Sequence, residues 1–202
     1  MWRMGGILFV AINQPGSNNN HQRNLSASSP LPVDDNEAEY LARNGANIAW
    51  INKAFDSATL DQTTKGVVIM QQANPFERFL EANQGYTRSG YEDFITTLRS
   101  RTVAFAKPVV LVGGDTHTVR IDKPLTTLYP GHTSTTGSAI QPATAGTRLQ
   151  NFTRVEVFGA PDVHWVRGVV DPFDPNVFVF AMHTINGNGH GRDGRNDEDD
   201  LQ

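Results

Sequence analysis

The chain has 202 residues, no cysteine and a formal net charge of -4 at neutral pH. A chain of this length suits one domain with a substantial core, and the lack of cysteine excludes disulfides, thiolate zinc sites and cysteine nucleophiles. The mild negative charge creates no field that attracts nucleic acid or an anionic membrane, and no apolar run approaches the roughly 20 residues that span a bilayer. We therefore expect neither nucleic acid nor membrane as a partner. The composition does not indicate the cellular compartment.

The first predicted strand comprises residues 7–12, a continuous apolar run typical of a strand buried on both faces. We therefore expect the chain to begin inside a core strand. Residues 13–32 follow as a long loop rich in Asn, Ser and Pro. Within this loop, the side-chain amides of Asn18 and Asn19 are candidates for contacting phosphate or sugar. The same composition is also typical of a plain irregular turn.

Two helices and two more strands are predicted in alternation. The first helix begins near Asp34 and Asp35, because acidic residues suit the positive end of the helix dipole. The strand 66–70, a helix over about 89–105 and the strand 109–112 come next. Helical spacing predicts that each helix buries four apolar side chains: Leu41, Ile48, Ile51 and Phe55 on the first, and Phe94, Ile95, Leu98 and Phe105 on the second.

This alternation predicts an α/β fold with parallel strands and right-handed crossovers. Ligands of such sheets bind at the carboxyl ends of the strands. The loops that follow residues 12, 70 and 112 are therefore expected to meet at one edge of the sheet.

The last part of the chain has a different pattern. Residues 125–149 have the composition of a loop, and the short β-rich runs 152–158, 163–170 and 177–182 predict an antiparallel ending to the sheet. Residues 186–202 are polar and charged, which predicts a disordered tail. We expect one domain over residues 1–185, followed by this tail.

Asp115 and His117 are the leading candidates for a metal site. They follow the third buried strand in the run Gly113-Gly114-Asp115-Thr116-His117, where glycines permit a tight turn. A carboxylate and an imidazole two residues apart are able to point at one ion, and both are ligands of zinc, iron and manganese. The alternative is a turn aspartate that bonds its own backbone beside a structural histidine.

Gln72 and Asn74 follow the middle strand and are the other candidates at this edge. Their amides are able to bond a substrate or to serve as weak oxygen ligands, and they also suit a simple loop cap. Sequence motifs for a serine hydrolase elbow, a P-loop, a dinucleotide site and a zincin are lacking.

The run 109–117, Val-Val-Leu-Val-Gly-Gly-Asp-Thr-His, resembles the late strand and Gly-His-x-His motif of metallophosphoesterases of the calcineurin-like kind. His117 matches the final histidine, Asp115 stands in place of the first, and Gln72 stands where the family has a histidine one strand earlier. The resemblance extends in order from residue 7 to about residue 183. It implies a partial metallophosphoesterase-like sandwich.

The resemblance also implies a hydrolase that cleaves small-molecule phosphate esters with water activated by two divalent transition metal ions. Asp115, His117 and Gln72 would be metal ligands, with Asp115 and His117 catalytic, and Asn74, Asn18 and Asn19 would contact substrate. The family's earlier motifs, Asp-x-His, Gly-Asp and Gly-Asn-His-Asp/Glu, are not found in this sequence.

Three interpretations follow from those departures. The chain is an active hydrolase once a missing segment completes it, a degenerate domain kept for binding or scaffolding, or the product of a truncated gene model. A chain that begins at residue 7 of such a sheet would leave that strand unpaired, so we also expect oligomerisation through the open edge.

Overall fold

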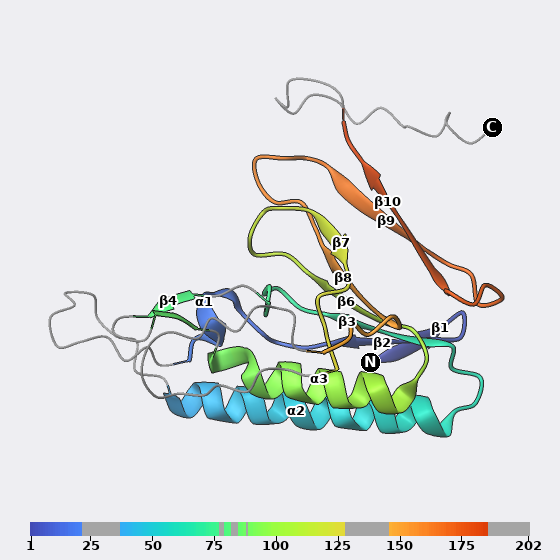
Figure 1. The fold of residues 1–202 in the computed structure, drawn as a ribbon, viewed down its shortest axis with the longest axis horizontal. Coiled ribbons are helices and arrows are strands. Elements are labelled where there is room, and N and C mark those ends of the chain that lie inside the picture. Colours follow the sequence, from blue (N-terminus) through green and yellow to red (C-terminus); the bar gives the residue numbers. More distant parts are fainter. Residues whose placement is uncertain (22–36, 77–78, 82–84, 88, 128–145, 186–202) are drawn as a thin grey trace, which may run out of the picture.

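The computed structural model describes residues 1–21, 37–76, 79–81, 85–87, 89–127 and 146–185. This part of the chain has a mixed α/β architecture with a six-stranded main sheet (Figure 1). The predicted tail 186–202 and most of the predicted loop 125–149 lie outside the described residues. Among the helices that are described, none is both long and apolar enough to cross a bilayer.

The main sheet contains four parallel strands flanked by two antiparallel edge strands. In spatial order it comprises β1 (Trp2–Met4), β2 (Ile7–Ala11), β3 (Gly66–Met70), β6 (Val109–Gly113), β8 (Phe152–Glu156) and β7 (Arg120–Asp122). The three predicted parallel strands are confirmed. The antiparallel prediction for residues 152–158 holds on one side only, because β8 pairs antiparallel with β7 but parallel with β6.

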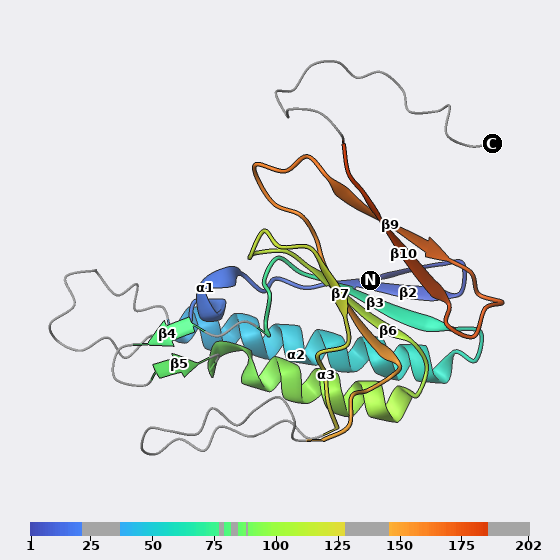
Figure 2. The same cartoon turned by 45° about the horizontal axis from the view of Figure 1, so that its top comes forward.

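Both long helices, α2 (Glu37–Leu60) and α3 (Glu92–Phe105), cover the same face of the sheet (Figures 1 and 2). A short turn, η1 (Ser89–Tyr91), precedes α3. All four side chains predicted for the core face of α3 are buried. Parallel strands with crossover helices on one face bring the carboxyl ends of β2, β3 and β6 to one edge.

The core face of α2 is shifted by one residue from the prediction at its start. Ile51 and Phe55 are buried and Ile48 is half-buried, but Leu41 is 59% exposed. Tyr40, Asn44 and Asn47 occupy the buried face instead, because a helix rotates its side chains by about 100° per residue. Polar Asn at two of these positions concealed the true phase.

A hairpin of β9 (Trp165–Val170) and β10 (Phe178–His183) covers the other face of the main sheet (Figures 1 and 2). Its strands are antiparallel as predicted, but they form a separate sheet. Alternate side chains pack on a second apolar cluster that includes Val68, Val110 and Val155. A further small sheet contains β4 (Phe79–Glu81) and β5 (Gly85–Thr87).

The edge of the sheet beside β2 is closed by β1. Residues 2–4 pair with β2 through the two-residue turn Gly5-Gly6, whose φ values of +57° and +77° suit a type I′ hairpin. The expectation that the strand at Ile7 has an unpaired edge is therefore wrong. Oligomerisation itself is not tested by this pairing and remains a prediction.

Candidate functional site

The loops that follow β2, β3 and β6 meet at the carboxyl edge of the sheet, as the sequence predicts. The Ala73 amide donates to the Gln14 carbonyl at 3.1 Å, and the Gly114 amide donates to the Gln72 carbonyl at 3.0 Å. The Gly16 amide also donates to Oε1 of Gln72. These bonds join all three loops, which we call the carboxyl-edge loops.

Asp115 and Gln72 are in direct contact. Nε2 of Gln72 donates to Oδ1 of Asp115 at 3.2 Å, whereas Oδ2 of Asp115 is buried and has no hydrogen-bond partner among the residues that the structure describes. The carboxylate lies against Gly16, where an added Cβ would come within 2.4 Å of Oδ1. Only glycine therefore allows the first carboxyl-edge loop to approach Asp115 this closely.

His117 is held by a different part of the chain. Its exposed ring lies against Gly159, and Nδ1 is 2.9 Å from the carbonyl oxygen of Ala160. Asp115 and His117 come from one turn, but among the described residues they contact different loops. Asp115 contacts the loop after β3, and His117 contacts the loop after β8. A carbonyl only accepts, so this bond places the proton of a neutral ring on Nδ1 and leaves the lone pair on Nε2.

Asn74 faces away from the candidate metal ligands. It is 2% exposed, and its Nδ2 lies 3.2 and 3.1 Å from the two carboxylate oxygens of Glu156, the last residue of β8. Its Oδ1 accepts from Arg154 at 3.2 Å. The predicted role in substrate binding is not tested by this geometry, but the amide is already satisfied inside the protein.

Glu156 and Arg154 belong to a buried polar network. Glu156 accepts from Thr116 and Arg120, and Arg154 makes two bonds to Asp122, at 2.8 and 2.6 Å. Two cations and two anions balance in this network, and they connect β7 and β8 to the loops that follow β3 and β6. Strict alternation with the apolar Phe152 could have revealed that Arg154 and Glu156 point inward from the strand.

Asn18 and Asn19 lie in α1 (Gly16–Asn19), which is a left-handed turn: the φ values from Ser17 to Asn20 lie between 51° and 60°. Both side chains are 0% exposed. Oδ1 of Asn18 accepts from the Gly90 amide at 3.0 Å, and Nδ2 of Asn19 donates to the Gly90 carbonyl at 2.8 Å. These amides fasten the turn to η1.

α2 secures the same turn from the other side. Arg43 donates to the side-chain and main-chain oxygens of Asn19. Tyr40 donates to the Gly90 carbonyl at 3.5 Å. Burial, followed by the nearby charge of Asp93, raises the pKa of the Tyr40 phenol to about 12, which keeps this donor protonated.

Strained backbone is concentrated at this edge. Eight non-glycine residues of the described part have positive φ, and six of them are Ser17, Asn18, Asn19, Asn20, Asp115 and His117. Such conformations persist where the surrounding structure forces them, and they often accompany functional sites.

Gln14 and Gln71 carry buried side-chain atoms at this edge that have no hydrogen-bond partner among the described residues. Gln14 is 1% exposed, and neither the nitrogen nor the oxygen of its side-chain amide bonds a described residue. Oε1 of Gln71 is also buried without such a bond, whereas its Nε2 donates to the Ala73 carbonyl at 3.1 Å. Sequence reasoning overlooked Gln14 because a lone glutamine after a strand carries no specific signal. Buried polar atoms without partners are uncommon and call for a bound group or water.

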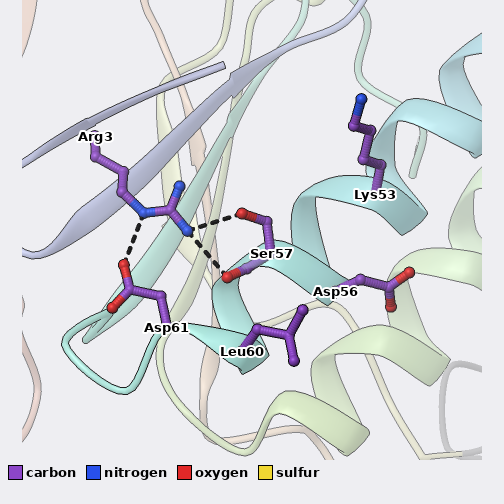
Figure 3. A pocket seen from close by; sticks show the side chains of 6 residues that line it. All are labelled: Arg3, Lys53, Asp56, Ser57, Leu60 and Asp61. Carbon is purple, nitrogen blue, oxygen red and sulfur yellow. Dashed lines mark hydrogen bonds and ion pairs between the residues drawn. The ribbon is translucent and has the colours of Figure 1, made fainter.

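A groove lies at the opposite end of the parallel strands, between β1 and the last turns of α2. It is lined by Arg3, Lys53, Asp56, Ser57, Leu60 and Asp61 (Figure 3). Arg3 bridges it by bonding Asp61 at 3.0 Å and the Ser57 hydroxyl at 2.9 Å. Arg3 and Asp61 are already paired with each other, and Asp56 pairs with Arg101 outside the groove, so it is a weaker candidate site than the carboxyl edge.

Asp61 gives a pH-dependent prediction in this groove. The Thr63 hydroxyl and amide both donate to its Oδ1, and with Arg3 they lower the pKa of Asp61 to about 2. An unfolded aspartate has a pKa of about 3.9, so this stabilisation is complete above pH 4 and is lost as the pH falls toward 2. NMR titration of the Asp61 carboxyl should show the low pKa, and Thr63→Val should raise it. An unchanged pKa in the variant would contradict the assigned cause.

Comparison with protein-family models, curated proteins and solved structures finds no match to this chain.

Proposed function

We propose that the chain is a metallophosphoesterase-like hydrolase domain that acts on small-molecule phosphate esters at its carboxyl-edge loops. The observation that carries this proposal is the buried Oδ2 of Asp115, for which the described part of the chain offers no hydrogen-bond partner. A buried carboxylate oxygen is costly unless a cation or a donor satisfies it. A divalent cation bound there would satisfy it.

The chemistry of the donors fits one divalent cation better than two. The described residues contain no group of three or more His, Cys, Asp or Glu that could hold a metal ion. Asp115 supplies one strong oxygen ligand, and the unpartnered amide oxygens of Gln14 and Gln71 belong to the same edge. Oxygen donors suit magnesium and manganese. The second ion of the proposed family would need ligands beyond these.

A bound divalent cation lowers the pKa of a coordinated water and stabilises charge on a phosphate ester. The chain's own residues prepare the site. Gln72 orients the Asp115 carboxylate through the bond to Oδ1, and Gly16 leaves room for that carboxylate. His117, with Nδ1 bonded to a carbonyl, presents Nε2 in the form that binds metal or accepts a proton.

Asp115→Asn tests this proposal because it keeps the shape of the side chain and removes its charge. We expect the full chain to bind Mn²⁺ in isothermal titration calorimetry and the variant to bind at least about tenfold more weakly. Hydrolysis of p-nitrophenyl phosphate should fall in the same variant and after His117→Ala. Asp56→Asn, at an exposed aspartate of α2, serves as the control. Equal hydrolysis by wild type and His117→Ala would refute the catalytic role of His117.

The alternative is a non-catalytic domain that binds or scaffolds a partner. The observation that favours it is that most candidate side chains are satisfied within the chain: Gln72, Asn74, Asn18, Asn19 and His117 all make internal hydrogen bonds. If metal analysis and calorimetry find no bound cation and no hydrolysis, this second function is the better one.

A further inference from the structure

Thr116 lies between the two candidate ligands in the sequence, and its side chain bonds a partner that neither of them contacts. Its hydroxyl donates to Oε1 of Glu156, whereas Asp115 contacts Gln72 and His117 contacts Ala160. Three consecutive side chains are thus held by three different parts of the chain. The middle contact is the one made inside the protein, because Glu156 is 1% exposed.

Glu156 is a rigid anchor for that hydroxyl. It ends β8, where it pairs in register with Gly113 of β6 on one side and Arg120 of β7 on the other. Its carboxylate also accepts from Arg120 at 2.9 Å and from Asn74. The position of Thr116 is therefore fixed by neighbours on both sides of β8.

The turn needs such an anchor because of its backbone. Asp115 has φ of 84° and His117 has φ of 60°, both in the left-handed region that ordinary side chains avoid. A turn with this conformation keeps its shape only if its surroundings impose it. Thr116 lies between these two strained residues in the sequence. Its hydroxyl makes a charge-assisted hydrogen bond to the buried carboxylate of Glu156.

We propose that Thr116 is the positioning residue of the carboxyl edge, and that its bond to Glu156 sets the direction of Asp115 and His117. This inference rests on the proposed function where its test measures cation affinity. The conformation of the turn is testable without a bound cation. Thr116 touches no substrate in this scheme and acts through its two neighbours.

The test compares Thr116→Val with Thr116→Ser in the full chain. Valine keeps the shape and removes the donor, and serine restores the donor. We expect Thr116→Val to bind Mn²⁺ about tenfold more weakly by calorimetry, and Thr116→Ser to bind within about twofold of wild type. Thr102→Val is the matched control, since Thr102 is buried and its hydroxyl bonds no residue within the described ranges. Equal affinity of Thr116→Val and wild type would overturn the inference, as would an equal loss in Thr102→Val.

Hydrogen exchange separates this inference from the proposed function. If wild type binds no Mn²⁺, the proposed cation site fails, and the positioning role is judged by the amides of residues 115–117. Faster exchange there in Thr116→Val, with recovery in Thr116→Ser, would support the positioning role. Unchanged exchange in the valine variant would reject it.

Discussion

Arg154→Met should lower the free energy of unfolding by about 3–5 kcal/mol, because it breaks a buried ionic network from one side. Arg154 is 8% exposed and bonds Asp122 and Asn74, with Glu156 at 3.6 Å. Methionine is similar in length and apolar, so little packing is lost. The cost arises because Glu156 stays buried with only the half-exposed Arg120 as its cation.

The matched control is Arg101→Met, the same change at an exposed ion pair. Arg101 bonds Asp56 at 2.7 Å, and their side chains are 32% and 60% exposed. Water screens such a pair, so the expected loss is about 0–1 kcal/mol. Urea unfolding followed by circular dichroism measures both variants. Similar losses for the two would show that the network around Glu156 contributes no more than a surface pair.

The sequence was sufficient to predict the part of the fold in which apolar runs are short and dense. Residues 66–70 and 109–112 are continuous apolar runs, and β3 and β6 occupy these positions. The four apolar positions of α3 are buried for the same reason. The prediction failed where polar residues face inward: Asn44 and Asn47 of α2 bury their amides and displaced the expected face.

The direction of β8 was not predictable because strand direction depends on the path of the preceding chain. A local pattern of Phe, Thr, Arg, Val and Glu shows alternation and a strand, but pairing with β6 is set by a long connection. The β1 hairpin was missed for a different reason. Residues 2–4 are exposed, and Gly5-Gly6 was the only turn signal.

The sequence predicts where the candidate site lies, but only some of the contacts that its residues make. Parallel topology brings Gln72 and Asp115 together, as the order of strands and helices implies. The separate contact of His117 with Ala160 depends on the loop after β8, which lies more than 40 residues further along the chain. Whether a cation draws His117 and Asp115 onto one ion remains a prediction.

Gly90→Ala should detach the left-handed turn from η1 and lower the free energy of unfolding by about 1–3 kcal/mol. A Cβ at this position would lie 2.0 Å from the carbonyl oxygen of Asn18, which is main chain and has no rotamer that could relieve the clash. The bonds of Asn18 and Asn19 to Gly90 would then lengthen or break. Faster hydrogen exchange of the Gly90 and His21 amides should report the change.

Gly45→Ala provides the opposite result on the same protein. Gly45 lies in the middle of α2, and apart from the helix's own backbone no described atom lies within 4 Å of an added Cβ. Alanine also loses less backbone entropy in a helix than glycine does. This variant should gain about 0.5–1 kcal/mol. If only Gly90→Ala lowers the free energy of unfolding, the cause is the clash with Asn18 and not the replacement of a glycine in itself. Equal stability of the two variants would mean that the left-handed turn moves aside freely, and that Asn18 and Asn19 do not hold the carboxyl-edge loops in place.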